Sequence, residues 1–228
     1  MNGTIDQIQT GVEFLNADEA VKRIPEAASI MVGGFGFPGM PRQLSKALVR
    51  RIELDQLTLI MNSLGSVSTL NALFEQNRIK KVIGSFFSTN KELVVAYQEG
   101  KVEIELLPQG TFTEAIRLGG AGIPAFFTPT AAGTVLAEGK ETRIINGCEH
   151  VLEQSLTADV AIIRAHKADK AGNLVYKKTA QNFNPAMATA AKLTIVEVDE
   201  IVEVGELDPD SIVTPFIFVD IVVKREEV

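Results

Sequence analysis

Glycine and proline crowd one short segment near the start of this 228-residue chain. Residues 33–41 read Gly-Gly-Phe-Gly-Phe-Pro-Gly-Met-Pro, and they lie between a run typical of a buried strand and a helical pattern. Glycine lets a backbone approach a ligand closely, and the first N–H groups of a helix favour an anion. The segment therefore predicts a phosphate-binding loop, with a tight turn at a sheet edge as the alternative; its members are Gly33, Gly34, Phe35, Gly36, Phe37, Pro38 and Gly39.

The same segment contains a G-x-G-x-x-G pattern at Gly34, Gly36 and Gly39. In a dinucleotide-binding fold, an acidic residue at the end of the second strand would bond the ribose. Asn62 occupies that place, and Pro38 lacks the N–H group that a phosphate cradle would use. The pattern therefore gives little support to NAD binding.

Other residue types offer little further chemistry. His150 and His166 have no cysteine or carboxylate at metal-ligand spacing, so no metal site is predicted, and His166 is expected at the surface. The only cysteine, Cys148, is expected to be a small half-buried side chain, and a lone cysteine suits a reducing, cytoplasmic setting. A cluster of carboxylates near a strand end is also expected at the surface: Glu197, Asp199, Glu200 and Glu203.

The elements that would position these residues alternate along the chain. Apolar runs predict strands at 29–32, 57–61, 81–86 and 101–107, and 3.6-residue periodicity predicts helices at 42–53, 68–75, 90–98 and from 111. Further strands are expected at 160–163, 174–176, 193–197 and 216–223, with a helix at 185–191. This order predicts an α/β fold: a mostly parallel open sheet flanked by helices.

Two segments depart from that alternation. Residues 119–147 are rich in glycine, proline, alanine and threonine, which predicts a loop-rich β extension around a ligand. Residues 1–14 lack the basic and apolar regions of a signal peptide and are interpreted as a loose leader. We therefore expect a single domain over residues 1–228.

The composition excludes several kinds of partner. The formal net charge of −7 argues against nucleic acid and against an anionic membrane as the main partner. No run approaches the roughly 20 apolar residues that a membrane-spanning helix needs. An anionic small molecule remains compatible, because local N–H groups can hold phosphate in an acidic protein.

The glycine-rich segment also resembles a family signature. Its G-G-F-x-x-x-G-x-P pattern is similar to that of family I (3-oxoacid) coenzyme A transferase alpha subunits. The resemblance extends from about residue 16 to 223 and is closest to bacterial acetate or butyrate–acetoacetate CoA-transferases. It implies the open-sheet fold that these enzymes share with sugar-phosphate isomerases. The further segments in the family's order are 106–111, 119–124, 127–134, 165–174, 181–185 and 203–207.

The resemblance implies ping-pong transfer of CoA through a glutamate in a Glu-Asn-Gly motif. The chain contains no Glu-Asn dipeptide, so that glutamate is expected on a separate homologous beta subunit, in an α2β2 assembly. CoA would be a substrate, exchanged between acyl-CoA and short carboxylic acids, and no tightly bound cofactor is expected. A ligand-sensing domain of the same fold and a sugar-phosphate isomerase are the alternatives.

Several site residues follow from the same resemblance. Gln109 lies between a predicted strand and a helix, and its neutral amide is expected to donate to an oxyanion. A loop-capping glutamine is the alternative. Two groups are expected to form substrate loops, with ordinary flexibility or turn stabilisation as alternatives: Gly119, Gly120 and Gly122, and the pair Asn182 and Asn184.

The chain departs from the family pattern at two predicted site positions. Ser88 and Ala132 stand where many members have glycine. These differences are expected to affect the choice of acyl group.

Overall fold

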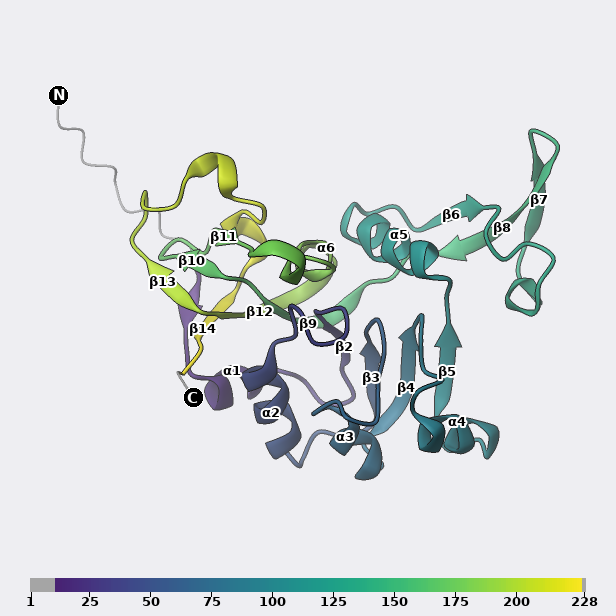
Figure 1. The fold of residues 1–228 in the computed structure, drawn as a ribbon, viewed down its shortest axis with the longest axis horizontal. Helices are drawn as coiled ribbons and strands as arrows, with labels where there is room; N and C mark the ends of the chain where they lie inside the picture. The colour runs from purple at the N-terminus through teal and green to yellow at the C-terminus, as the bar shows by residue number, and fades with distance from the viewer. Residues whose placement is uncertain (1–10, 227–228) are drawn as a thin grey trace.

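An eight-stranded parallel sheet forms the centre of the molecule (Figure 1). The computed structural model describes residues 11–226. The prediction of a mostly parallel sheet is confirmed, since every pairing in this sheet is parallel. The strands lie in the order β1 (Glu13–Phe14), β14 (Ile221–Lys224), β12 (Ala191–Val198), β9 (Ala158–Arg164), β2 (Ser29–Val32), β3 (Leu57–Ile60), β4 (Ile79–Gly84) and β5 (Glu103–Leu106).

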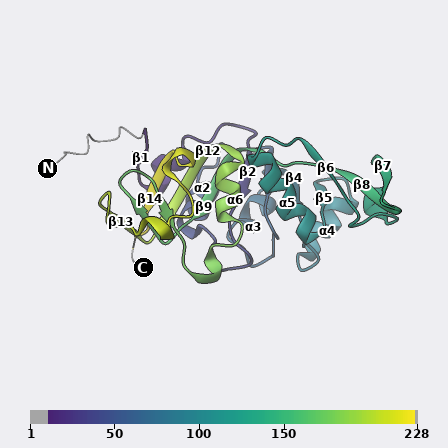
Figure 2. The same cartoon turned by 90° about the horizontal axis from the view of Figure 1, so that it is seen from above.

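Helices cover both faces of this sheet (Figures 1 and 2). Alternate residues of each strand point to opposite faces and enter two separate clusters of buried side chains. The first cluster contains residues of α1 (Ala17–Val21), α2 (Arg42–Arg50), α3 (Asn71–Glu75) and α4 (Lys91–Gln98). The second contains residues of α5 (Gln109–Gly120) and α6 (Asn184–Thr189).

The strand order reverses between β2 and β9. From β2 the chain proceeds through β3, β4 and β5 toward one edge, whereas β9 is followed by β12 and β14 toward the other. Because the sheet is parallel, the loops after all these strands meet at one edge, and open α/β sheets bind ligands at such a reversal point. The segment after β2 is residues 33–41, which we call the glycine loop.

Helix α2 is shorter than its apolar spacing predicted. It ends at Arg50, and Ile52, which the periodicity placed on the buried face, is 78% exposed. The cause is the buried guanidinium of Arg78, which donates to the carbonyl oxygens of Leu48 (3.3 Å) and Val49 (2.9 Å). A cation that binds these last carbonyls satisfies the end of the helix and opposes its dipole.

Residues 121–150 form an arm in which no residue is buried (Figure 1). Three antiparallel strands hold it together, in the order β6 (Ala125–Thr128), β8 (Cys148–Gln154) and β7 (Thr142–Ile145). The sequence predicted mainly loops here and missed β8. A β extension is present, and Figure 1 shows it projecting away from the main sheet.

A second three-stranded sheet lies beside the main one, in the order β11 (Leu174–Val175), β10 (Lys167–Asp169) and β13 (Glu200–Val202). The strand predicted at 216–223 is wrong in its first half. Residues Phe216–Phe218 form a 3-10 turn, because the N–H of Phe216 donates to Asn173 Oδ1 (3.1 Å) instead of a neighbouring strand. At the other end, residues 1–10 of the predicted leader lie outside the described residues, and Glu13–Phe14 form β1.

Candidate active site

Positive backbone angles shape the glycine loop. The φ angles are 114° at Gly34, 61° at Gly36 and 74° at Gly39, a region that side chains other than glycine rarely adopt. The loop turns tightly, because the N–H of Phe35 donates to the carbonyl oxygen of Pro38 at 3.1 Å. Glycine is therefore required here by the conformation of the turn itself.

The two phenylalanines of the loop remain accessible. Phe35 is 53% exposed and Phe37 is 57% exposed. The ring of Phe35 stacks on Phe183, with centroids 6.3 Å apart, and the guanidinium of Arg42 lies 5.9 Å from the ring centroid of Phe37. The loop thus presents apolar faces at the edge of the sheet where the parallel strands end.

Asn184 supports the glycine loop from the interior of the protein. Its side chain is fully buried, and its Nδ2 donates to the carbonyl oxygens of Gly39 (3.1 Å) and Ala180 (2.9 Å). Its Oδ1 accepts from the N–H of Arg164 at 2.9 Å. A Cβ atom added to Gly33 would lie only 1.8 Å from Asn184 Oδ1, so the first glycine makes room for this amide.

Asn182 binds the same loop from its outer side. Its Nδ2 donates to the carbonyl oxygens of Pro38 (3.0 Å) and Thr179 (2.9 Å). The structure therefore brings Asn182 and Asn184 together with the glycine loop, although they are separated from it by more than 140 residues of sequence.

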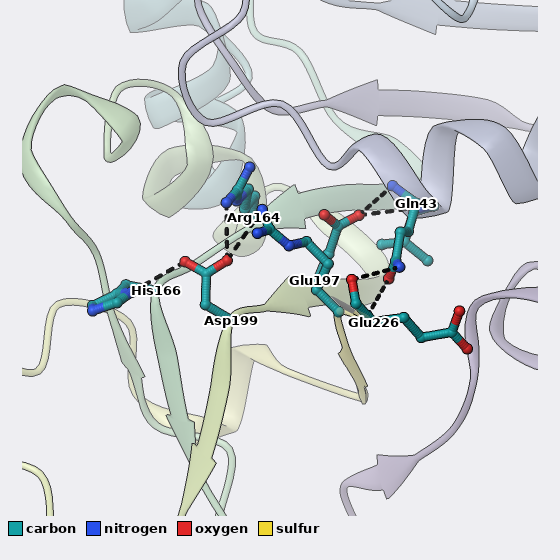
Figure 3. Close-up of polar contacts among 8 residues, drawn as sticks. Gln43, Arg164, His166, Glu197, Asp199 and Glu226 are labelled. Atoms are coloured by element: carbon teal, nitrogen blue, oxygen red, sulfur yellow. Dashed lines mark hydrogen bonds and ion pairs between the residues drawn. The ribbon is translucent and has the colours of Figure 1, made fainter. Parts of the chain in front are cut away.

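A buried carboxylate occupies the N-terminus of α2, directly after the glycine loop (Figure 3). Glu197 Oε2 accepts from the N–H groups of Gln43 (2.7 Å) and Leu44 (3.2 Å). These are the groups that the sequence predicted to be unpaired and to hold a phosphate. The expectation of a surface position for Glu197 is wrong, since its relative exposure is 0%. The anion at this helix terminus belongs to the protein itself.

Burial dominates the protonation of this carboxylate. It raises the pKa of Glu197 above its ordinary value, against the opposing effects of the two backbone hydrogen bonds and of the Arg164 and Arg225 charges. Its second oxygen, Oε1, is buried and forms no hydrogen bond with any described residue. A proton on Oε1 would neutralise the carboxylate, whose negative charge is only partly compensated by the two backbone hydrogen bonds and the two arginines.

A second carboxylate lies at the end of β12, next to Glu197 (Figure 3). Asp199 is partly buried and contacts Arg164 NH2 (2.9 Å), His166 Nδ1 (3.1 Å) and Arg225 NH1 (3.4 Å). Burial raises the pKa of Asp199, but the His166 hydrogen bond and the two arginine charges outweigh it and lower the pKa below the ordinary value. His166 is likewise half-buried and held by Asp199, so it is less exposed than the sequence predicted.

Three polar side chains meet at the ends of consecutive strands. Asn62 follows β3, Ser85 follows β4 and Gln109 follows β5. Gln109 Oε1 accepts from Asn62 Nδ2 (2.7 Å) and from Ser85 Oγ (2.5 Å), and Asn62 is only 6% exposed. Because the oxygen of the amide is engaged twice, its Nε2 faces away from these partners, and it donates to no described residue.

Close approach of the strand ends makes this cluster possible. A Cβ on Gly84 would lie 2.0 Å from the carbonyl oxygen of Met61, so glycine lets the end of β4 contact the end of β3. Ser85 and Asn62 were not predicted as site residues. Their positions directly after buried apolar runs, at the same sheet edge as Gln109, were the signal that the sequence offered.

The predicted glycines of the substrate loop lie elsewhere. Gly119 and Gly120 form the last turn of α5, whereas Gln109 begins it, about 15 Å away along the axis at about 1.5 Å per residue. Added Cβ atoms would lie 2.0 Å from Leu156 O and 2.2 Å from Thr189 Oγ1, so both glycines serve close packing. Gly122 follows with a φ of 72° and open space around it. The structure does not bring these three residues together with Gln109.

Other sequence expectations concern isolated positions. Cys148 is exposed at the start of β8, so its predicted half-buried position is wrong. Ser88 lies exposed in the loop after β4, and Ala132 lies in the arm. Within residues 11–226, no group of three or more His, Cys, Asp or Glu side chains could hold a metal ion. Over the same range, no helix has the length and apolar character that crossing a membrane requires.

Three curated relatives match nearly the whole chain. The A subunit of a probable succinyl-CoA:3-ketoacid coenzyme A transferase of Bacillus subtilis (strain 168) is 47% identical over 93% of this chain and 90% of its own length. The A subunit of the 3-oxoadipate CoA-transferase of Pseudomonas putida is 50% identical over 90% and 89%. The alpha subunit of the acetate CoA-transferase of Escherichia coli (strain K12) is 44% identical over 94% and 98%.

Solved structures share the fold. An acyl-CoA transferase of Escherichia coli O157:H7, in a thioester complex with CoA, superposes with a TM-score of 0.84 at 22% identity. The match covers 94% of this chain but only 47% of that one, so this chain spans about half its length. The glutaconate coenzyme A-transferase of Acidaminococcus fermentans gives a TM-score of 0.79 at 20% identity, over 92% of this chain and 75% of that one. The family model for coenzyme A transferase matches residues 14–225, and the chain therefore belongs to the coenzyme A transferase family.

Proposed function

We propose that this chain is the alpha subunit of a heteromeric CoA-transferase. The enzyme moves CoA between a short-chain acyl-CoA and a free short-chain or 3-oxo acid such as acetate, butyrate or acetoacetate. The relatives named as A or alpha subunits cover 90–94% of this chain at 44–50% identity, which supports the assignment. The names of these relatives refer to different acids, so the test must compare several acids as acceptors of CoA.

The observation that carries the proposal is the orientation of the Gln109 amide. Asn62 and Ser85 hold its oxygen, at 2.7 and 2.5 Å, and direct the N–H₂ group away from the cluster. A neutral donor fixed before the reaction can stabilise the oxyanion that forms when a thioester or anhydride carbonyl is attacked. Gln109 is therefore the donor that this chain supplies to the reacting centre.

A separate homologous beta subunit supplies the nucleophile, a glutamate in a Glu-Asn-Gly motif. The chain has no Glu-Asn dipeptide, and it spans only 47% of the acyl-CoA transferase of Escherichia coli O157:H7. A partner of similar length would complete that architecture. We propose an α2β2 assembly, acting in the cytoplasm.

The reaction proceeds by double displacement. The partner's glutamate carboxylate attacks the thioester carbonyl, the C–S bond breaks, and CoA leaves as a thiolate, so that a mixed anhydride of the acyl group and the glutamate remains. The thiolate attacks the glutamyl carbonyl, which releases the first acid and leaves a glutamyl-CoA thioester. The carboxylate of the second acid attacks the glutamyl-CoA thioester, its C–S bond breaks, and CoA leaves as a thiolate while a second mixed anhydride forms. The thiolate then attacks the acyl carbonyl of this anhydride, which gives the new acyl-CoA and releases the glutamate carboxylate. Gln109 donates to the oxyanion of each tetrahedral state.

The glycine loop and its braces serve CoA binding in this proposal. Asn182 and Asn184 hold the loop at 3.0 and 3.1 Å, so that its exposed phenylalanines form a rigid surface. Gly119 and Gly120 support this surface only indirectly, through the packing of α5, and Gly122 lies in the turn that follows this helix. Ser88 and Ala132, in the β4–α4 loop and the arm, are the positions where acyl specificity would differ from relatives with glycine.

Two other functions are weaker. A ligand-sensing domain or a sugar-phosphate isomerase could share the sheet, but the family match over residues 14–225 favours the transferase. An isomerase would act on sugar phosphates without a partner chain.

The test is reconstitution. The chain alone is expected to lack transferase activity, whereas co-expression with a homologous beta subunit that carries the Glu-Asn-Gly motif should give exchange between acetyl-CoA and a panel of acids. Peptide mapping of the trapped glutamyl thioester should locate it on the beta subunit. Robust activity from the isolated chain, or a thioester on one of its own glutamates, would defeat the proposal.

A further inference from the structure

The arm of residues 121–150 has no hydrophobic core of its own (Figure 1). No residue between 121 and 150 is buried, although the segment contains large apolar side chains. Val135 is 77% exposed and Ile144 is 67% exposed. A small antiparallel sheet gains independent stability from a packed apolar face or from further strands. The arm therefore has the character of a segment that another chain completes.

Strand β7 is an open edge of this arm. Within residues 11–226 its one strand neighbour is β8. The N–H of Leu152 donates to the carbonyl oxygen of Glu141 at 2.9 Å, so the backbone groups of Glu141 and Arg143 face β8. Backbone groups alternate in direction along a strand, and those of Thr142 and Ile144 therefore point outward. This row of outward N–H and C=O groups is a template for a further strand.

The other edge of the arm, β6, is protected. Pro124 and Pro129 flank this strand directly on both sides. Proline has no N–H group, and its presence beside an edge strand hinders pairing with another chain. Strand β7 has no proline, and three of its four residues are β-branched, which favours strand pairing. The edge that remains available is therefore β7.

The charges on this edge are complementary to themselves. Glu141 and Arg143 lie on the same face and contact each other at 2.9 Å. In an antiparallel pair of two β7 strands centred on Thr142, Glu141 of each copy lies opposite Arg143 of the other. Registers centred on Glu141 or Arg143 would place like charges opposite each other, and one centred on Ile144 would leave Arg143 opposite Ile145.

The backbone and the apolar side chains suit the same register. Thr142 lies opposite Thr142 of the second copy, and its outward N–H and C=O groups form the hydrogen bonds of that pair. Ile144 lies opposite Lys140 of the second copy. The Lys140 ammonium group is held by Glu153 at 2.8 Å, and its methylene groups can cover the exposed Ile144 side chain.

We propose that β7 pairs with β7 of a second copy of this chain, antiparallel and centred on Thr142. The two arms then form one continuous sheet, and each copy contributes the same surface, as a two-fold contact requires. The inference rests on the proposed function for the α2β2 assembly and specifies the contact between its two alpha chains.

The first test is charge reversal in the full chain without a beta subunit. Wild type should form a dimer in sedimentation equilibrium, and Arg143→Glu should weaken dimerisation by at least about 10-fold, because both pairs become repulsive. Glu141→Arg/Arg143→Glu restores opposite charges in the same register and should return dimerisation to within about 3-fold of wild type. The matched control is Arg117→Glu on α5, an exposed cation that pairs with Glu114 at 2.9 Å, and it should leave the dimer unchanged.

The double reversal also separates charge from local packing. The guanidinium of Arg143 lies 4.6 Å from the ring centroid of Phe127, and both variants lose this contact. Recovery of the dimer in the double variant would therefore attribute the loss in Arg143→Glu to charge. Because Arg143 is exposed, both variants should keep the thermal unfolding of the monomeric chain.

The second test places a cysteine at the centre of the contact. Residues opposite each other in a hydrogen-bonded antiparallel pair have Cα atoms about 5.5 Å apart, which suits a disulfide. Cys148 is exposed, so it is removed in each variant. Thr142→Cys/Cys148→Ser should cross-link to a dimer under mild oxidation, whereas Thr128→Cys/Cys148→Ser, on the β6 edge, should remain monomeric on a non-reducing gel.

Several results would overturn the inference. They are a monomeric wild-type chain at micromolar concentrations, unchanged dimerisation of Arg143→Glu, no recovery in the double reversal, and equal cross-linking at the two edges. A monomeric chain whose Arg143→Glu variant fails to copurify with the beta subunit would assign this edge to that subunit instead. Neither test requires transferase activity, so an inactive reconstituted pair would defeat the proposed function without deciding the contact.

Discussion

Asn62 Nδ2 lies 2.7 Å from Gln109 Oε1, and this contact holds the amide oxygen in the cluster, so that the N–H₂ group of Gln109 points away from it. The relationship joins the ends of β3 and β5 across 47 residues of sequence. Because Ser85 binds the same oxygen, rotation of the amide would cost both hydrogen bonds. The catalytic proposal can therefore be tested separately at the donor and at its support.

Gln109→Ala should lower kcat of the reconstituted enzyme by about 10- to 1000-fold, since it removes one oxyanion donor. Gln109→Glu is the sharper variant. Its carboxylate keeps an acceptor for Asn62 and Ser85 but has no N–H₂ group, so it should be at least as impaired. Steady-state kinetics at saturating acetyl-CoA measure both, and wild-type kcat in either variant would remove Gln109 from the mechanism.

Asn62→Ala should lower kcat by about 10-fold because the Gln109 amide loses the partner that orients it. If Asn62 acts by positioning Gln109, the double variant with Gln109→Ala should be about as slow as Gln109→Ala alone. A double-mutant cycle on kcat measures the coupling. Strictly additive losses would mean that Asn62 acts independently of Gln109.

Glu197→Ala should lower the free energy of unfolding by about 2–3 kcal/mol, because the N–H groups of Gln43 and Leu44 lose their acceptor inside the protein. Glu197→Gln keeps an acceptor and should stay within about 1 kcal/mol of wild type. Urea denaturation at pH 8 compares the two. Equal losses would indicate that the carboxylate does not support the start of α2.

The pH dependence of the same pair follows from the raised pKa of Glu197. A carboxyl group that binds its proton more tightly in the folded state destabilises the fold above its folded pKa, and this penalty fades as the pH falls toward 4.5. Wild type should therefore gain stability relative to Glu197→Gln between pH 8 and pH 5, as measured by urea denaturation at each pH.

Gly33→Ala and Gly36→Ala should differ in cost. The first places a Cβ 1.8 Å from Asn184 Oδ1 and displaces a buried amide, so about 3 kcal/mol or more of stability should be lost. At Gly36 no atom lies within 4 Å, and only the strain of its φ of 61° remains, about 1–2 kcal/mol. Thermal or urea unfolding ranks them, and the opposite ranking would contradict the packing described for Asn184.

Asp159→Asn tests a link between β2 and β9, which are neighbours in the sheet but far apart in sequence. The N–H and hydroxyl groups of Ser29, followed by Lys192, lower the pKa of Asp159 to about 2. A depressed pKa stabilises the fold above about pH 4, and this contribution disappears as the pH falls from 3.8 toward 2. Because the side chain is partly exposed, the variant should lose only about 1 kcal/mol at neutral pH. Its deficit in urea denaturation should shrink in acid.

The sheet could be predicted because its central strands are short apolar runs that can be recognised in the sequence. The apolar runs of β2, β3 and β9 are buried on both faces, and such runs read the same way in sequence and in structure. The ends of α2 could not be predicted. Glu197 binds the first turn of α2 from 154 residues away, and Arg78 binds its last carbonyl groups from 27 to 30 residues away. A local sequence pattern does not predict such contacts.

The candidate site was predictable to a similar degree. Gln109 follows an apolar run at a strand end, and this position together with the family resemblance marked it. Its partner Asn62 entered the sequence analysis only as the residue that stands where a ribose-binding acid would be expected. Its contact with Gln109 was not predicted, because pairing between β3 and β5 residues across β4 depends on the close approach at Gly84. The arm was underestimated for a different reason: residues 121–150 bury no side chain, so its strands show little of the alternation by which strands are predicted.

The position of β9 in the sheet has a consequence for biosynthesis. β2 pairs with β9, and the Ser29–Asp159 contact spans 130 residues, so β2 emerges from the ribosome long before its neighbour. At about 5–20 residues per second, that neighbour is missing for on the order of 10 s. Meanwhile a nascent β2–β5 sheet displays the unpaired edge of an apolar strand, the kind of surface that attracts other strands or a chaperone.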